Sequence, residues 1–121
     1  MNYPLLQNKS LEKLIENINF SERKGMIIAS PSNDPPYKYH WIRDSALVMR
    51  VVLDKYKKTN ENKYLILIIN YIESEHHIQN LETKSGLGEP KINIDCTPFN
   101  GNWGRPQNDG PALRGIMMIK I

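Results

Sequence analysis

The stretch Tyr37-Lys38-Tyr39-His40-Trp41-Ile42-Arg43-Asp44 runs directly into the apolar segment Ser45-Ala46-Leu47-Val48-Met49. Aromatic rings and a histidine here precede an Arg-Asp pair, and a helix is expected to begin at that pair. The short carboxylate of Asp44 can accept hydrogen bonds from free backbone N–H groups and suits the positive end of a helix dipole. The sequence therefore predicts that Asp44 caps a helix running to about Tyr56.

The same residue types suit a carbohydrate. Flat aromatic faces pack against the C–H face of a pyranose, while a carboxylate and a forked guanidinium pair with its hydroxyls. For this stretch alone a simpler interpretation stays open, in which Trp41 belongs to the core, Arg43 to the surface, and Asp44 is only a cap.

A second stretch repeats this order: Gly101-Asn102-Trp103-Gly104-Arg105-Pro106-Gln107-Asn108-Asp109-Gly110-Pro111-Ala112-Leu113-Arg114. A tryptophan, an arginine and an aspartate again precede an apolar helix, and Pro111 suits its first turn because its missing N–H costs nothing there. Two such loops, each leading into an apolar helix, predict helical hairpins that present their loops on one shared face. Trp41 and Trp103 should then lie at the same end of the helical stack.

Hydrophobic spacing predicts four helices. The first opens at Ser10 and carries an inward stripe through Ile18, and the others span 44–56, 62–80 and 109–121. The second is apolar nearly all round, which predicts burial of most of its faces. The fourth has no terminating glycine or proline, so we expect the chain to be the first part of something larger.

The connecting segments differ in character. Residues 26–29 form a buried run too brief to tell strand from extended chain, and the three prolines of 30–36 indicate a stiff loop. Residues 83–110 are long, rich in glycine and proline, and mostly irregular. Their apolar and aromatic anchors favour an ordered functional loop over disorder.

Composition argues against several classes of partner. The net charge is +3, but sixteen Lys and Arg are spread among thirteen acidic residues without a dense basic block, so nucleic-acid binding is not expected. No apolar run approaches the roughly 20 residues that span a bilayer, and no signal peptide is visible at the N-terminus. We expect no membrane partner.

The sequence gives little support for a metal site or a reactive thiol. His76 and His77 are adjacent, so on a helix they point about 100° apart, whereas helical metal sites use histidines four residues apart. Cys96 is the only cysteine, so no internal disulfide can form, and no histidine lies near it at metal-ligand spacing. No metal and no cofactor are expected.

Taken together, the stretches 37–47, 86–95 and 101–114 closely resemble the glucoamylases of glycoside hydrolase family 15, and most of all the yeast-type members. The resemblance runs from about Gly25 to Ile121. It implies an all-α fold, part of an (α/α)6 toroid, with residues 1–121 as the N-terminal portion of a single catalytic domain. It also implies an inverting enzyme that releases glucose from the non-reducing ends of α-1,4-glucans such as starch and glycogen.

The resemblance assigns substrate-binding roles to individual residues. Arg43 and Asp44 match the pair that hydrogen-bonds the hydroxyls of the terminal glucose. The residues implied to surround that pair are two aromatics lining the pocket (Tyr37, Trp41), two polar wall residues (Lys91, Arg105) and a tryptophan across the scissile region (Trp103). Both catalytic glutamates of the family lie downstream of the matched region, so no catalytic residue is assigned, and Glu89 is expected to be a supporting residue only.

Other classes of function stay open at this stage. The chain could be a non-catalytic glucan-binding fragment, or an inactive remnant of a broken gene. The resemblance implies an α-glucan substrate, no obligate protein partner, and an extracellular or vacuolar location.

Overall fold

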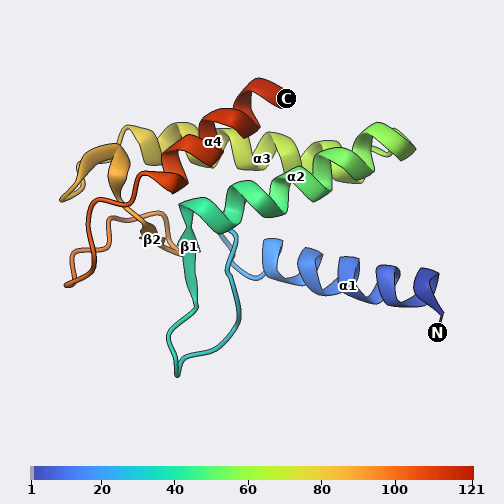
Figure 1. The fold of residues 1–121 in the computed structure, drawn as a ribbon, viewed down its shortest axis with the longest axis horizontal. Coiled ribbons are helices and arrows are strands. Elements are labelled where there is room, and N and C mark those ends of the chain that lie inside the picture. Colours follow the sequence, from blue (N-terminus) through green and yellow to red (C-terminus); the bar gives the residue numbers. More distant parts are fainter. Residues whose placement is uncertain (1) are drawn as a thin grey trace.

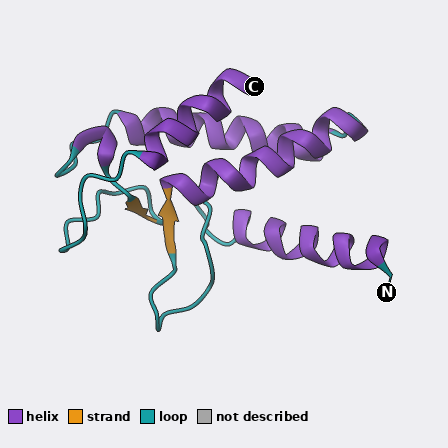
Figure 2. Ribbon diagram, in the orientation of Figure 1, coloured by secondary structure: helices purple, strands orange, loops and turns teal. Residues whose placement is uncertain are grey.

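The computed structural model describes residues 2–121 as four α-helices and one short β-ribbon joined by loops. The helices are α1 (Tyr3–Ile18), α2 (Ile42–Thr59), α3 (Asn62–Gln79) and α4 (Asp109–Lys120). The ribbon pairs β1 (Tyr39–Trp41) with β2 (Lys91–Asn93), and a 3-10 turn, η1, spans Gly86–Gly88. Figure 2 shows that both strands lie at one end of the helices. No helix in residues 2–121 is long and apolar enough to cross a bilayer.

α2 is the central helix. Asn60, in the left-handed conformation (φ 56°), ends it, and α3 then returns beside it in the opposite direction. In the view of Figure 1, α4 lies on one side of α2 and α1 on the other. The main core fills the space between the helices, and its buried members are Ile18, Ile27, Ala46, Met49, Val52, Leu53, Tyr64, Ile68, Tyr71 and Met117.

The prediction that the first helix opens at Ser10 is wrong. α1 begins at Tyr3, where the Asn2 side chain accepts a hydrogen bond from the Leu5 N–H at 3.2 Å and Pro4 sits in the first turn. Asparagine at the cap and proline in the first turn are both favourable, so the helix starts about two turns earlier. Its inward stripe does pack against the core, as predicted.

The prediction that Asp44 is the N-cap of the second helix is also wrong. α2 begins at Ile42, the N-cap position is Trp41 without a capping side chain, and Asp44 lies in the first turn. The Ile42 N–H instead donates to the Pro90 carbonyl at 3.1 Å. A backbone group from the distant segment before β2 therefore satisfies one of the free N–H groups of the helix start.

The second helix is less buried than its composition predicts. Its inner face (Ala46, Met49, Val52, Leu53) belongs to the core, but Leu47 and Val51 are exposed. The predicted boundaries of the third and fourth helices agree with the structure to within a residue.

The β-ribbon was not expected from the sequence, because three-residue strands carry too little pattern. β1 and β2 pair antiparallel with Tyr39 opposite Asn93, His40 opposite Ile92, and Trp41 opposite Lys91. The run at 26–29 joins them through a bridge between Ile28 and His40, and it is buried from Met26 to Ile28 while Ala29 is exposed. Because alternate side chains of a strand point to opposite faces, Tyr39 and Trp41 share one face and His40 lies on the other.

A polar network is buried behind this ribbon. His40 Nε2 lies 2.6 Å from Glu75 Oε1, and Arg114 Nη1 donates to Glu75 Oε2 at 3.0 Å. His40 Nδ1 accepts the Ile27 N–H at 2.9 Å and lies 3.1 Å from Ser45 Oγ. The network links β1, α2, α3 and α4, and none of these side chains has a substantial exposed area.

Gly25 follows α1 with φ 84° and lies against α3. A Cβ there would clash with the Asn70 carbonyl oxygen and with Ser74 Oγ. We expect Gly25→Ala to lower the free energy of unfolding by more than about 1 kcal/mol, measured by urea unfolding followed by circular dichroism. Gly115→Ala is the control: nothing lies within 4 Å of its Cβ in α4, so it should stabilise by about 0.5–1 kcal/mol. Equal effects of the two substitutions would contradict this packing.

Glu75 should make stability depend on pH. Burial raises the pKa of its carboxyl, but the His40 hydrogen bond and the Arg114 charge outweigh burial and hold that pKa below the ordinary 4.5. At neutral pH we expect Glu75→Gln to cost about 3–5 kcal/mol, because Arg114 loses its buried counter-charge.

A carboxyl whose folded pKa is depressed contributes stability above its unfolded pKa and loses it as pH falls through the folded value. The difference between wild type and Glu75→Gln should therefore be full above pH 4.5 and shrink below it. Urea unfolding at about pH 7 and about pH 3 measures this. A difference that is the same at both pH values would be the contrary result.

Candidate functional site

Arg43 joins the starts of α2 and α4. Its Nε donates to Asp44 Oδ1 at 3.3 Å, and its Nη1 donates to Asp109 Oδ2 at 3.1 Å. Gly110 permits this close approach, since a Cβ there would lie 3.2 Å from the Ile42 side chain. The side chains of Arg43, Asp44 and Asp109 are 37%, 38% and 53% exposed, so a ligand can reach them.

The ion pair keeps both Arg43 and Asp109 charged. The hydrogen bond to Asp109 is the main reason why the pKa of Arg43 lies above its usual value, and the same bond holds the pKa of Asp109 below its usual value. Both groups are therefore ionised at neutral pH. Charged donors and acceptors side by side can bind hydroxyl groups, which both donate and accept.

Four aromatic rings form a cluster that includes Trp41, two residues before Arg43. Trp41 and Trp103 meet edge to face with ring centroids 5.6 Å apart, and Tyr39 lies 6.5 Å from Trp41 and 5.2 Å from Phe99. The contact between Trp41 and Trp103 confirms that the two aromatic-Arg-Asp loops lie on the same face. Trp103 remains half exposed, so one wall of the cluster is open.

Lys91 lies at the centre of the aromatic cluster. Its Nζ is 3.5 Å from the ring centroid of Trp103, 4.1 Å from Tyr39, 4.3 Å from Phe99 and 4.9 Å from Trp41. The residue is buried, and burial, with a smaller effect of Arg105, lowers the pKa of its ammonium group. Attraction to the ring faces offsets part of the cost of burying the cation.

Arg105 is fixed by its neighbours. Its Nε lies 2.8 and 2.9 Å from the two carboxylate oxygens of Glu89, and its Nη2 donates to the Phe99 carbonyl at 3.0 Å. Ser85 Oγ also donates to Glu89, at 2.8 Å. Glu89 therefore anchors the loop that carries Trp103.

Tyr37 is the predicted site residue that the structure leaves furthest from the rest. It precedes β1 in the loop, its side chain is 45% exposed, and its N–H donates to the Ser32 carbonyl at 3.0 Å. Within residues 2–121 it makes none of the ring contacts of the aromatic cluster. Trp41, Lys91, Arg105 and Trp103 thus lie in or against one aromatic cluster, and Arg43 and Asp44 form an ion pair that begins two residues after Trp41. Tyr37 belongs to neither group.

Sequence reasoning missed several residues around the site. Tyr39 and Phe99 provide two of the four rings around Lys91. Asp109, like Asp44, accepts a hydrogen bond from Arg43. The alternation of Tyr39, His40 and Trp41 fits a strand with one aromatic face, but three residues are too few to predict one. No sequence pattern links Glu75 to His40 and Arg114.

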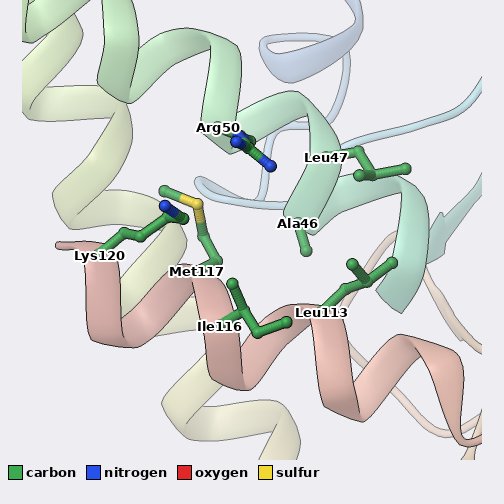
Figure 3. A pocket seen from close by; sticks show the side chains of 7 residues that line it. All are labelled: Ala46, Leu47, Arg50, Leu113, Ile116, Met117 and Lys120. Atoms are coloured by element: carbon green, nitrogen blue, oxygen red, sulfur yellow. The ribbon is translucent and has the colours of Figure 1, made fainter.

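An apolar groove between α2 and α4 is separate from this cluster. Figure 3 shows side chains of α2 facing those of α4 across it. The lining residues are Ala46, Leu47, Arg50, Leu113, Ile116, Met117 and Lys120. The groove offers aliphatic surface with two cations and no aromatic ring or carboxylate, so it does not share the chemistry of the Arg43 site.

Comparisons with known proteins agree on one family. Residues 8–121 match the family model described as glycosyl hydrolases family 15. Glucoamylase-1 of Schizophyllum commune is 48% identical over 102 residues, covering 78% of this chain and 18% of that protein. The probable glucoamylase of Schizosaccharomyces pombe is 47% identical over 103 residues, covering 79% of this chain and 23% of its own.

Solved structures give the same result. The glucoamylase of Saccharomycopsis fibuligera superposes with a TM-score of 0.85 at 38% identity, covering 90% of this chain and 26% of that one. The family 15 glucoamylase of Hypocrea jecorina gives a TM-score of 0.86 at 41% identity, covering 91% and 21%.

This chain thus spans about a fifth to a quarter of the length of these relatives. Its all-α fold corresponds to part of their (α/α)6 toroid, as the sequence predicted. By the extent of the family match and the agreement of the structures, the chain belongs to glycosyl hydrolases family 15.

Proposed function

We propose that this chain supplies part of the substrate site of a glucoamylase that releases glucose from the non-reducing ends of α-1,4-glucans with inversion. Residues 1–121 would be the N-terminal portion of a single catalytic domain. The observation that carries the proposal is the Arg43-Asp44 pair, to which Asp109 is also bonded, following two residues after Trp41 of the aromatic cluster.

The charged group is suited to the hydroxyls of one sugar. A pyranose is neutral, so binding it firmly requires hydrogen bonds to charged partners, each worth about 1.5–3 kcal/mol. Asp44 offers two acceptor oxygens and Arg43 offers several donors, and both side chains are partly exposed. Asp109 keeps the guanidinium in place while Asp44 and the remaining donors face the ligand.

The aromatic cluster would form the apolar wall of the same site. Trp103, half exposed next to Trp41, can pack on the C–H face of a sugar ring. Lys91 and Arg105 would supply further donors, and Tyr37 would line the outer part of the pocket.

The cleavage step itself needs groups from elsewhere. Inversion requires a carboxylic acid and a carboxylate roughly 6.5–9.5 Å apart. Near the site, Asp109 is held ionised by Arg43, Glu89 is paired with Arg105, and Glu75 is buried against Arg114. Each of these carboxylates is held by an arginine rather than free to give up a proton, and we propose that both catalytic glutamates lie outside these 121 residues.

The test is a chimera. Residues 8–121 of this chain replace the matching segment of the Saccharomycopsis fibuligera glucoamylase, and glucose release from maltotriose is measured. We expect the chimera to release glucose, and the 121-residue chain alone to release none, because it lacks the acid and the base. A folded chimera without glucose release would contradict the proposal, and hydrolysis by the chain alone would contradict the absence of catalytic groups.

Asp44→Asn in the chimera tests the charge of the proposed sugar ligand. Losing a charge-assisted bond of about 1.5–3 kcal/mol should lower kcat/KM roughly 10- to 150-fold. The melting temperature should barely move, because an asparagine keeps the shape of the side chain and Asp44 does not cap α2.

The matched control is Asp54→Asn, which removes an exposed carboxylate from the same helix far from Arg43. It should leave kcat/KM unchanged. If Asp44→Asn were as active as the Asp54→Asn control, Asp44 would have no part in sugar binding.

A further inference from the structure

We propose that Glu75 is a positioning residue that holds the Arg43-Asp44 half of the sugar site at a fixed distance from the Asp109 half. Its effect on sugar binding rests on the proposed function, while its effect on the geometry of the site does not. Glu75 lies outside the site itself, on α3, and its side chain is fully buried.

The Glu75 carboxylate contacts one residue from each half of the site, on the buried side. Its Oε1 lies 2.6 Å from His40 Nε2, and its Oε2 accepts from Arg114 Nη1 at 3.0 Å. His40 precedes Arg43 by three residues across the junction of β1 and α2, and Arg114 follows Asp109 within α4. Together with the Arg43–Asp109 bond on the exposed side, these two contacts of Glu75 form a closed ring through α2, α3 and α4.

The hydrogen bonds fix the protonation of this network. His40 Nδ1 accepts the Ile27 N–H at 2.9 Å, so the proton of a neutral imidazole lies on Nε2 and is donated to Glu75. The network then contains one anion, Glu75, and one cation, Arg114. The charges balance, which a fully buried group requires.

The bridge is short and shielded from solvent. The side chains of His40, Glu75 and Arg114 are at most 5% exposed, so a shift of the carboxylate must move the histidine, the arginine or both. Other contacts also hold the start of α4, including Gly110 against Ile42 and the Gln107 N–H to the Gly88 carbonyl at 2.9 Å. The experiment must therefore ask whether Glu75 is needed in addition to them.

Two variants separate geometry from stability. Glu75→Asp keeps the charge but shortens the side chain by one methylene, so it cannot reach both partners. The double variant Glu75→Gln/Arg114→Met removes the bridge without leaving a buried unpaired charge, which protects folding. Val52→Ala is the control, since it removes buried volume from α2 without touching the network.

The readout is the pKa of Asp109, followed by carboxyl 13C NMR in the 121-residue chain. In the wild type and in Val52→Ala, the bond from Arg43 should hold this pKa below 3.8. In both bridge variants it should rise toward 3.8, because the Arg43–Asp109 distance is no longer fixed. An Asp109 pKa that stays at the wild-type value in a folded bridge variant would overturn the proposal.

The chimera supplies the functional readout. Looser placement of Arg43 and Asp109 weakens contacts made equally in the ground and transition states, so KM for maltotriose should rise roughly tenfold with little change in kcat. Val52→Ala should leave KM unchanged even if it lowers the melting temperature.

A wild-type KM in the bridge variants would overturn the role of Glu75 in sugar binding. If the unsubstituted chimera releases no glucose, the proposed function fails, and the Asp109 titration still decides the role of Glu75 in site geometry.

Discussion

The Arg43 guanidinium, bound by Asp44 on one side and Asp109 on the other, joins two helix starts that are far apart in the sequence. Each aspartate lies in the first turn of its helix, where the positive end of the dipole favours a carboxylate. Two such carboxylates would repel each other without the arginine between them. Arg43 thus allows α2 and α4 to begin side by side, and Gly110 gives them the space to do so.

Around this contact the chain buries several charged groups. Lys91 is enclosed by four aromatic rings, Glu89 is paired with Arg105, and Glu75 is paired with Arg114. Each buried charge has a partner or a ring face, and each of these contacts fixes a loop or a helix start. A site built from loops is held rigid in this way, so that its hydrogen-bonding groups need little reordering when a sugar binds.

The helical part of the fold could be predicted from hydrophobic spacing, and the shared face of Trp41 and Trp103 from the repeated order of residues around them. The starts of α1 and α2 could not, because local rules favoured Ser10 and Asp44 while Asn2 and the Pro90 carbonyl supply the actual partners. Of the seven nominated residues, six lie in the aromatic cluster or in the Arg43-Asp44 pair that follows Trp41, and Tyr37 lies in neither. The repeated order marked Asp109 but not its bond to Arg43, and no local pattern marked Glu75, because these contacts span 35 to 66 positions of sequence.

The most direct measurement is a crystal structure of the chimeric catalytic domain with glucose bound. We predict one glucose whose hydroxyls accept from Arg43 and donate to Asp44, with Trp103 against the ring and Asp109 still bonded to Arg43. Glucose bound elsewhere, with Arg43 and Asp44 free of any sugar contact, would contradict the assignment of this site.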